Sequence, residues 1–483
     1  MTKNFFYTVL LSIVNILYPV ISFPYASRIL GPVGIGKVQF IVSLSQYFAL
    51  FAALGIPIYG IAQAARYKED PKKLANVFAE LTGVYFIASL LLSAVYLVMI
   101  FTVPFFFAER SLYIYAGSLI LLSFCYTDWF YAGIEEFRII TIRSVVVKVI
   151  CLGLLYVYVK TRADFGKYLL IIVFSILGNQ LFSFVTITRK IHFRFSELEF
   201  KKHLKPLFYI FGAGLAASVY TVLDTVLIGF LSTEKVVGLY TAAVKIVRIT
   251  FPFVTAMGVI LMPAISKSFS VNDIAEVRKH HTNSFNFLTF FAIPVCAGIL
   301  ILAPEFILVF SGKEFAEAAI SMQILSLLPI LVGVGHFFHL QVLIPSGKNK
   351  EVFFSMLVGM CTCLILNFAL VPFLNEIGAS IATVFTELVV TVCYGFFIVR
   401  YFTLNYNWKL FFQSCISVVP FLPIVLLVRH MHIDMAFTLL ISICFCTVFY
   451  TCMHLFVFRN HFLFTFIKPL LQRFRSNKII DHA

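Results

Sequence analysis

Residues 23–37, which read FPYASRILGPVGIGK, lie between two long apolar runs and decide the fold of this chain. The apolar helix predicted here contains Pro19 and Pro24 and ends in Arg28, which is followed by Gly-Pro-x-Gly. This pattern predicts a broken membrane helix that carries a cation near its outer end. Polar residues at such a depth in a bilayer are typical of transport pathways.

The composition places the chain among membrane proteins. Hydrophobic residues make up 61% of the 483 residues and charged residues 12%, with 57 Phe and 2 Trp. Soluble domains carry about 25% charged residues, so a soluble globular fold is excluded. All ten cysteines lie in apolar segments and form no CxxC pair, which predicts buried thiols without a disulfide framework or a metal site.

Apolar runs long enough to cross a bilayer recur along the chain. We predict an all-α polytopic membrane protein with about 14 transmembrane helices of roughly 20 residues each. Only Lys3 precedes the first run and no small-residue cleavage site follows it, so we interpret this run as a membrane helix and not as a signal peptide. The predicted spans are 5–22, 38–60, 77–102, 112–133, 141–159, 167–187, 206–230, 239–262, 283–303, 320–344, 352–371, 377–399, 410–428 and 434–457.

The distribution of basic residues predicts the orientation of the chain. With the N-terminus inside, the cytoplasmic segments hold 25 of the 37 Lys and Arg, and the outside connections hold nine. By the positive-inside rule we expect a multi-pass membrane protein with both termini in the cytoplasm. The basic loop 188–205 then faces anionic lipid, so the net charge of +15 gives no reason to expect a nucleic-acid partner.

A few charged residues are predicted to lie within the spans. They are the cations Lys148, Lys245 and Arg248 and the acids Asp128, Asp224 and Glu387. A charge at the bilayer centre costs about 2.5 kcal/mol or more. We therefore expect these six side chains to face a cavity or one another.

An internal repeat predicts the architecture. Residues 28–36 are echoed by 229–238, 53–56 by 256–259, 133–136 by 347–350 and 159–166 by 371–378, at offsets of 202 to 214 residues. Six helices per repeat give both copies the same direction, so we expect two parallel six-helix bundles around a central cavity that opens to one side at a time. The two extra C-terminal helices either line a groove or pack against the C-terminal half. The predicted domains are residues 1–200, residues 201–402, and residues 403–483 with helices 13 and 14 and a cytoplasmic tail.

Three segments, residues 23–40, 128–142 and 340–350, resemble the bacterial oligosaccharide flippases of the polysaccharide-transporter branch of the multidrug/oligosaccharidyl-lipid/polysaccharide exporter superfamily. This resemblance implies twelve core helices in two bundles, here with two more. It also implies movement of undecaprenyl-diphosphate-linked oligosaccharide repeat units from the inner to the outer leaflet, for O-antigen, capsule or exopolysaccharide synthesis. The implied partners are this lipid-linked oligosaccharide, membrane lipids, and the polysaccharide polymerase and chain-length machinery.

The resemblance also points to individual cations. The related lipid II flippases use arginines on their first, second and eighth helices, and Arg28 and Arg248 match the first and the eighth. The second helix offers only Lys37 and Arg66, at its two ends.

The residues around Arg248 support an anion site without the resemblance. Thr241, Lys245, Arg248 and Pro252 share one face of the predicted helix, with Arg248 about 13 Å below its outer end. An arginine fork suits a pyrophosphate, to which it donates two parallel charge-assisted hydrogen bonds. Asp224 lies at a depth similar to that of Lys245, so an ion pair that only joins two helices is the alternative for this pair.

The other polar residues leave alternatives open. Lys148 either lines the cavity as a further substrate-binding residue or reaches the cytoplasmic head groups. Asp128 and Glu387 either carry a coupling proton or join helices. His336 and His339 share a helix face without a third ligand, so we expect no metal, and no cofactor other than a coupling ion, proton or sodium.

Two other functions compete with that of a flippase. A MATE-like, cation-coupled drug exporter of the same superfamily needs acids for a cationic drug, whereas Arg28, Lys245 and Arg248 favour an anion. An integral membrane polysaccharide polymerase generally carries large outside loops, and the outside loops here are short. The motifs GxSxG, HExxH and GxxxxGK[ST] do not occur, so we predict no enzyme and no catalytic residue.

Overall fold

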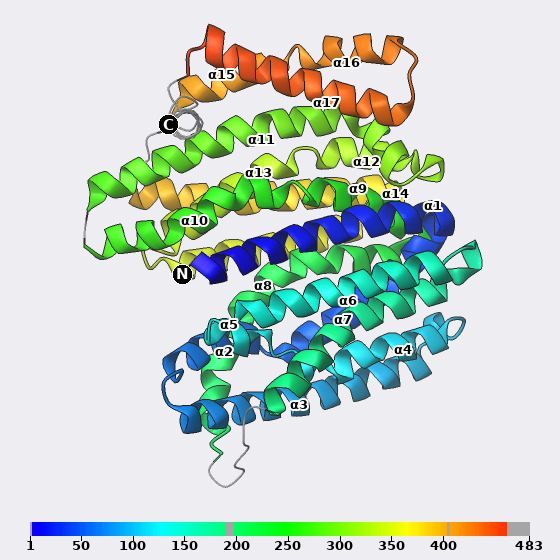
Figure 1. Cartoon of the computed structure of the whole chain (residues 1–483), viewed down its shortest axis with the longest axis vertical. Coiled ribbons are helices and arrows are strands. Elements are labelled where there is room, and N and C mark those ends of the chain that lie inside the picture. The colour runs from blue at the N-terminus through cyan, green and yellow to red at the C-terminus, as the bar shows by residue number, and fades with distance from the viewer. Residues whose placement is uncertain (1, 190–197, 272, 403–405, 461–483) are drawn as a thin grey trace, which may run out of the picture. The chain divides into compact units, whose positions relative to one another are not determined.

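The computed structural model describes residues 2–189, 198–271, 273–402 and 406–460 (Figure 1). Every regular element in these ranges is a helix. The α-helices are α1 (Thr2–Ala53), α2 (Ile56–Arg66), α3 (Pro71–Thr102), α4 (Arg110–Leu121), α5 (Asp128–Gly133), α6 (Phe137–Tyr158), α7 (Phe165–Thr188), α8 (Lys201–Leu231), α9 (Glu234–Arg248), α10 (Phe251–Ser270), α11 (Ile274–Phe310), α12 (Ala318–Leu325), α13 (Leu328–His336), α14 (Asn349–Tyr401), α15 (Trp408–Val418), α16 (Phe421–His430) and α17 (Met435–Cys452).

The helices are long and apolar enough for a multi-pass membrane protein. In the part of the chain that the structure describes, ten stretches meet the length and hydropathy of a membrane span. Two of them, Phe6–Ala53 and Asn349–Tyr401, are 48 and 53 residues long, and each covers two of the predicted spans. The all-α, polytopic fold is therefore confirmed, while the count of 14 spans stays a prediction.

Large apolar side chains are exposed along these helices. Phe373 and Val399, both on α14, are 82% and 81% exposed. An apolar surface of this kind is costly in water and is expected where helices face hydrocarbon.

The longest helices are broken where the sequence repeat lies. Gly31 interrupts α1 with a φ of 67°, and Asn375 interrupts α14 with a φ of 51°. Glycine and asparagine are the residues that tolerate this left-handed backbone best. The break at Gly31 falls in the repeat segment 28–36, and its counterpart 229–238 contains the connection between α8 and α9. The break at Asn375 falls in the repeat segment 371–378, and its counterpart 159–166 contains the connection between α6 and α7. Each repeated segment of these two pairs thus ends one helix and begins the next, as the predicted repeat requires.

By spatial compactness the chain divides into two units. Unit 1 comprises residues 1–241 and 366–379, and unit 2 comprises residues 242–365 and 380–483. The predicted domains follow the sequence repeat rather than compactness, and their boundaries stay a prediction.

In unit 1, α1 packs against α3, α4, α6 and α7, and α2 lies beside α5 at one end of the unit (Figure 1). Glycines allow α2 and α5 to approach closely. A Cβ on Gly60 would lie 2.4 Å from the Trp129 ring, and a Cβ on Gly133 would lie 2.5 Å from the Ala64 Cβ. The aromatic and glycine positions of the segment 128–142 therefore fix how α5 packs.

In unit 2, the C-terminal helices α15, α16 and α17 pack on α11 (Figure 1). The guanidinium of Arg429 on α16 donates to both carboxylate oxygens of the buried Glu305 on α11, at 2.6 and 2.9 Å. The Tyr450 hydroxyl on α17 donates to the carbonyl of Phe290 on α11 at 2.9 Å. Both roles left open for the extra helices are observed: they pack against α11, and Phe421, Ile443 and Cys446 line a pocket together with residues of α11.

Candidate functional site

Arg28 lies on α1 one turn before the break at Gly31. Its neighbours Ala26 and Leu30 are buried, whereas the side chain of Arg28 is exposed. Seven residues earlier on the same face, Ile21 is 45% exposed. The break ends the helix just beyond Arg28, so a cation lies close to an irregular stretch of backbone within unit 1.

Lys245 and Arg248 lie in the last turn of α9, where a positive charge interacts favourably with the helix dipole. Lys245 is half-buried and Arg248 is exposed. The expectation of a single face that runs on to Pro252 is wrong, because α9 ends at Arg248 and α10 begins at Phe251. Pro252 has no N–H to donate to the carbonyl of Arg248, which ends the helix at this cation.

Asp224 is buried on α8 within a hydrogen-bond network of unit 1. Its carboxylate accepts hydrogen bonds from the Tyr240 hydroxyl on α9 at 3.1 Å and from the Asn367 amide on α14 at 3.4 Å. Asp224 therefore joins three helices. The ion pair between Asp224 and Lys245 stays a prediction.

Asp128 forms part of a buried polar cluster at the start of α5. A terminal nitrogen of Arg143 donates to both carboxylate oxygens of Asp128, at 2.8 and 2.9 Å. The Arg143 Nε also donates to the side-chain oxygen of Asn179 at 3.2 Å. The hydroxyl of Ser183 donates to Asp128 at 3.4 Å. Asp128 is thus tied to α6 and α7, which supports the interpretation that it joins helices.

Arg143 lies in the predicted span 141–159 but was not among the charged residues expected inside the membrane. It lies in α6, six residues after its start, and only 3% of its side chain is exposed. Hydropathy gave no signal of this, because Arg143 stands at the edge of an apolar run. The signal that could have found it is the nearby acid Asp128, which needs a partner inside the membrane.

Lys148 and Glu387 also occupy partly buried positions. The ammonium of Lys148 on α6 donates to the Asn15 side-chain oxygen on α1 and lies 5.7 Å from the centre of the Tyr18 ring. Lys148 thereby joins α6 to α1. Glu387 lies half-buried on α14 in unit 2.

Glu80 is a buried acid that the sequence analysis did not single out. Its carboxylate on α3 is 0% exposed and accepts hydrogen bonds from the Lys202 ammonium at 2.9 Å and the backbone N–H of Glu199 at 2.8 Å. A His203 ring nitrogen lies 2.7 Å from the other oxygen, and the second ring nitrogen lies 3.0 Å from the Tyr59 hydroxyl. This network holds the start of α8 against α2 and α3.

The two sequence repeats meet in a reciprocal glycine contact within unit 1. A Cβ on Gly36 of α1 would lie 1.7 Å from the carbonyl oxygen of Glu234 on α9, and a Cβ on Gly238 of α9 would lie 2.0 Å from the carbonyl oxygen of Pro32 on α1. Gly36 and Gly238 are 202 residues apart in the sequence, and so are Pro32 and Glu234. The two repeats therefore meet through equivalent residues, as in a two-fold interface.

Charged groups flank this glycine contact. The ammonium of Lys37 lies 2.8 Å from a carboxylate oxygen of Glu109 and 3.7 Å from one of Glu234. Partial burial raises the pKa of Glu234, an effect that the nearby Lys37 opposes. Lys37 thus links α1 to α9 and to the residue before α4.

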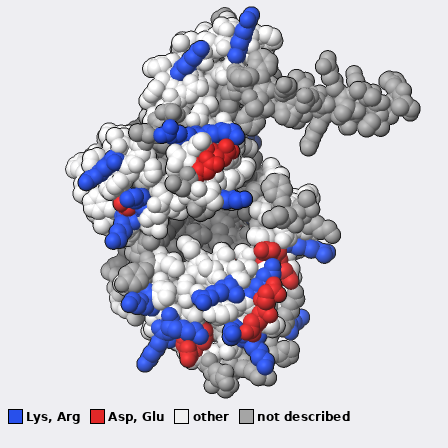
Figure 2. All heavy atoms as spheres, turned by 90° about the vertical axis from the view of Figure 1, so that its left-hand side faces the viewer, with Lys and Arg blue, Asp and Glu red and all other residues white. Residues whose placement is uncertain are grey.

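Within unit 1, basic side chains lie among acidic ones on the face drawn in Figure 2, which is the left-hand side of Figure 1. Within unit 1 this face includes the turns between α2 and α3 and between α5 and α6. In these turns the ammonium of Lys68 lies 3.3 Å from the Glu135 carboxylate. The positive-inside rule predicts such a surface for the cytoplasmic face, and the orientation of the termini stays a prediction.

Among the residues that the structure describes, no group of three or more His, Cys, Asp and Glu could hold a metal ion. The ring of His339 stacks on Tyr394, with the ring centres 5.9 Å apart. Parts of the basic loop and the tail, residues 190–197 and 461–483, lie outside the described residues.

The fold and these buried polar clusters define the class of a multi-pass membrane protein with charged groups inside its helix bundles. The chain belongs to the family described as polysaccharide biosynthesis protein, which matches residues 1–269. It is similar to the putative O-antigen transporters of Shigella dysenteriae and Escherichia coli (strain K12), with 23% identity to each. These matches cover 81% and 80% of this chain and 98% and 94% of the relatives.

Further matches agree with this assignment. The lipid II flippase MurJ of Bacillus subtilis (strain 168) is 25% identical over 44% of this chain and 42% of its own length. Since the relatives are named transporters and flippases, the chain is a membrane transporter and not an enzyme.

Two solved structures have the same fold. One is described as the lipid II flippase MurJ in an inward closed conformation, with a TM-score of 0.74, 15% identity, and coverage of 98% of this chain and 100% of the other. The other is an inward-facing multidrug resistance MATE family transporter, with a TM-score of 0.61, 14% identity, and coverage of 80% and 94%. At these identities the likeness concerns the fold alone.

Proposed function

We propose that this protein is a flippase that moves undecaprenyl-diphosphate-linked oligosaccharide repeat units from the inner to the outer leaflet of the bacterial cytoplasmic membrane. The observation that carries the proposal is the match to putative O-antigen transporters over 98% and 94% of their length. The exposed Arg28 and Arg248 support it, because a lipid diphosphate is an anion.

In this proposal the diphosphate is bound by arginine forks and the polyprenyl tail stays in lipid. Arg28 and Arg248 each lie at the end of a helical segment, next to a glycine or proline break. Substrate sites of transporters commonly lie at such discontinuous helices. An arginine can form two parallel hydrogen bonds to a phosphate group, which a lysine such as Lys245 cannot.

Alternating access is the mechanism we propose for the transfer. The reciprocal contact of Gly36 with Glu234 and of Gly238 with Pro32 brings equivalent parts of the two repeats together without intervening side chains. Opening this contact would expose the head group on the outer side, while both termini remain in the cytoplasm. A proton or sodium ion could drive the cycle, with Glu387 as the candidate residue for coupling. We propose the polysaccharide polymerase and chain-length machinery as partners.

Deletion of the gene in its native host tests the function. We expect loss of the surface polymer and accumulation of the lipid-linked repeat unit, both reversed by the wild-type gene. A polymerase would behave differently, because its loss leaves single repeat units attached to the surface acceptor. Normal polymer together with a new sensitivity to cationic drugs would contradict the proposal and favour a drug exporter.

A further inference from the structure

The side chain of Arg143 carries a buried nitrogen that its ion pair does not use. Its terminal nitrogen Nη2 donates to both carboxylate oxygens of Asp128, and its Nε donates to Asn179. The other terminal nitrogen, Nη1, is buried and has no acceptor among the residues that the structure describes. Buried donors in proteins are almost always hydrogen-bonded, so this nitrogen points to a ligand that supplies an acceptor.

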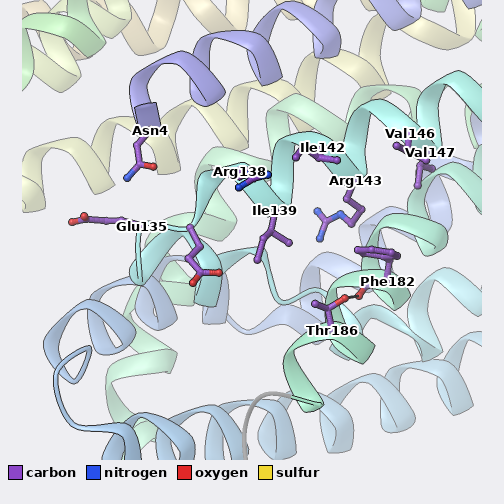
Figure 3. Close-up of a pocket in the computed structure, with 11 residues that line it drawn as sticks. Asn4, Glu135, Arg138, Ile139, Ile142, Arg143, Val146, Val147, Phe182 and Thr186 are labelled. Atoms are coloured by element: carbon purple, nitrogen blue, oxygen red, sulfur yellow. Dashed lines mark hydrogen bonds between the residues drawn. The ribbon is translucent and has the colours of Figure 1, made fainter. Parts of the chain in front are cut away.

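A pocket adjoins Arg143 on unit 1 (Figure 3). It lies between the start of α1, the start of α6 and the end of α7, and its volume is about 610 Å³. Small-molecule sites measure about 300–1,000 Å³, so a ligand of substantial size fits. Figure 3 shows the side chain of Arg143 pointing toward the space between Ile139 and Thr186, two other residues that line the pocket. Neither Arg28 nor Arg248 lines it, so the pocket is separate from the proposed diphosphate site.

The ion pair decides which kind of acceptor fits. The charge of Arg143 is already balanced by Asp128 at 2.8 Å, and only 3% of the Arg143 side chain is exposed. A phosphate or a second carboxylate at Nη1 would therefore bring an uncompensated negative charge into a buried place. A neutral carbonyl oxygen accepts the same hydrogen bond without adding charge.

One side of the pocket is apolar and continuous with the lipid-facing surface. Ile142 and Val146 on α6 and Phe182 on α7 line it, and they are 47%, 50% and 56% exposed. All three lie within helices long and apolar enough to span a membrane. A ligand in this part of the pocket is therefore in contact with hydrocarbon, which indicates a lipid of the surrounding leaflet.

The depth of Arg143 matches one neutral group of such a lipid. Arg143 lies six residues after the first residue of α6, which is about 9 Å along the helix. The head-group layer on each side of a bilayer is about 5–7 Å thick, so Arg143 lies close to the boundary between head groups and hydrocarbon. The ester carbonyls of a glycerolipid lie at this boundary. A polyprenyl diphosphate has no carbonyl group there.

We propose that this pocket binds one diacyl glycerophospholipid and recognises its ester linkage. An ester carbonyl accepts a hydrogen bond from Nη1 of Arg143. One acyl chain follows Ile142 and Val146 and contacts Phe182, and the head group extends past Asn4 at the mouth. An ether lipid of the same shape lacks the carbonyl and leaves Nη1 without an acceptor, so it binds less well.

Native mass spectrometry of the purified full chain tests this site, independently of the substrate that is transported. The protein is equilibrated with equal amounts of diester and diether phosphatidylglycerol of the same chain length, and the retained lipid is identified by its mass. Wild-type protein should retain the diester about tenfold more than the diether, the scale of one hydrogen bond to a charged group. Equal retention of the two lipids, or a preference for the diether, would overturn the proposal.

Two substitutions separate the hydrogen bond from the apolar contacts. Arg143→Lys keeps a cation opposite Asp128 but has no second terminal nitrogen, so the preference for the diester should disappear. Val146→Trp leaves the ion pair intact and fills the apolar part of the pocket, and it should reduce retention of the diester about tenfold. An undiminished preference in Arg143→Lys, or unchanged retention in Val146→Trp, would contradict the site.

Ile150→Trp is the matched control for the tryptophan variant. Ile150 lies one turn further along α6, is 46% exposed and does not line the pocket. Ile150→Trp should retain the diester as wild-type protein does. Equal losses in both tryptophan variants would place the lipid elsewhere on α6 and overturn the proposal.

Discussion

At the scale of single residues, the ion pair between Arg143 and Asp128 is the clearest structural feature of unit 1. Arg143→Ala leaves the partly buried Asp128 carboxylate without its partner, and we expect a loss of about 1.5–3 kcal/mol in stability, the scale of a hydrogen bond to a charged group. Thermal unfolding of the purified protein measures this loss. Arg138→Ala, which changes an exposed arginine of the same helix, should alter stability by no more than about 0.5 kcal/mol. Equal melting temperatures for the two variants would contradict a structural role for Arg143.

Substitution of Arg248 should impair transport and not stability. It is exposed at the end of α9, so Arg248→Ala should remove transport and leave the melting temperature unchanged. Arg248→Lys keeps the charge but loses the bidentate fork, and we expect partial transport. The measurement is surface polymer per amount of protein in the membrane. Arg278→Ala, at an exposed position of α11, is the control and should transport normally.

Sequence reasoning found charges at depth but could not assign their partners. Asp128 was a candidate for coupling or for joining helices, and its partner Arg143 was not counted among the buried charges because it stands at the edge of the predicted span 141–159. Glu80 was missed although it lies in a predicted span, since its partners Lys202 and His203 are distant in sequence. Long-range pairing of this kind depends on tertiary structure, which hydropathy does not encode.

At the scale of helices, the contact between α1 and α9 allows a direct test of alternating access. The backbones of α1 and α9 meet at Gly36 and Glu234, so cysteines at Lys37 and Glu234 should be joined by a short, reducible bifunctional thiol reagent, and this cross-link should stop transport until it is reduced. The native cysteines are replaced beforehand, so that only the new pair reacts. Cysteines at Lys68 and Glu135, whose ion pair joins two turns within one predicted bundle, are treated with the same reagent as the control, and their cross-link should leave transport intact.

Full transport with the first pair cross-linked would show that α1 and α9 need not separate. If both cross-links stop transport, any restriction of helix movement is sufficient to block the protein. That result would contradict the proposal that transport requires the specific contact of Gly36 and Gly238 to open.

The helix breaks were only partly predictable. Gly31 was found because it precedes Pro32 in the segment 23–37, and its φ of 67° needs glycine. The end of α9 at Arg248 was missed, since a proline in an apolar run was interpreted as part of one helical face. Proline at position 252 removes the hydrogen bond to residue 248, so the break follows from the sequence once this rule is applied.

At the scale of the whole molecule, the membrane class and the positions of the helices were predictable, because runs of apolar residues report directly on contact with hydrocarbon. Every predicted span overlaps a helix, but some contain a helix break, as span 239–262 does between α9 and α10. The roles of the extra C-terminal helices were not predictable. Their packing depends on Glu305 and Arg429, which lie 124 residues apart in the chain.

The orientation of the chain can be tested by labelling single cysteines. Cysteines introduced at Thr233 or Lys313 should react with a membrane-impermeant thiol reagent in intact cells, because both lie in predicted outside connections. Cysteines at Lys279 or Lys350 should react only after permeabilisation. Ser196 and Asn272, two further positions in predicted cytoplasmic connections, lie outside the described residues. Labelling of Lys279 from outside would reverse the orientation and with it the proposed direction of transport.

The central claim is that the protein moves a lipid-linked oligosaccharide across the bilayer. Proteoliposomes that contain the purified protein and an undecaprenyl-diphosphate-linked oligosaccharide test it most directly, with a membrane-impermeant glycosidase that cleaves only the exposed glycan. Wild-type protein should make the glycan of both leaflets accessible, whereas protein-free vesicles and vesicles with Arg248→Ala should expose only the outer leaflet. If vesicles with wild-type protein and protein-free vesicles protect the same fraction of the glycan from the glycosidase, the protein does not move this lipid, and the central claim is contradicted.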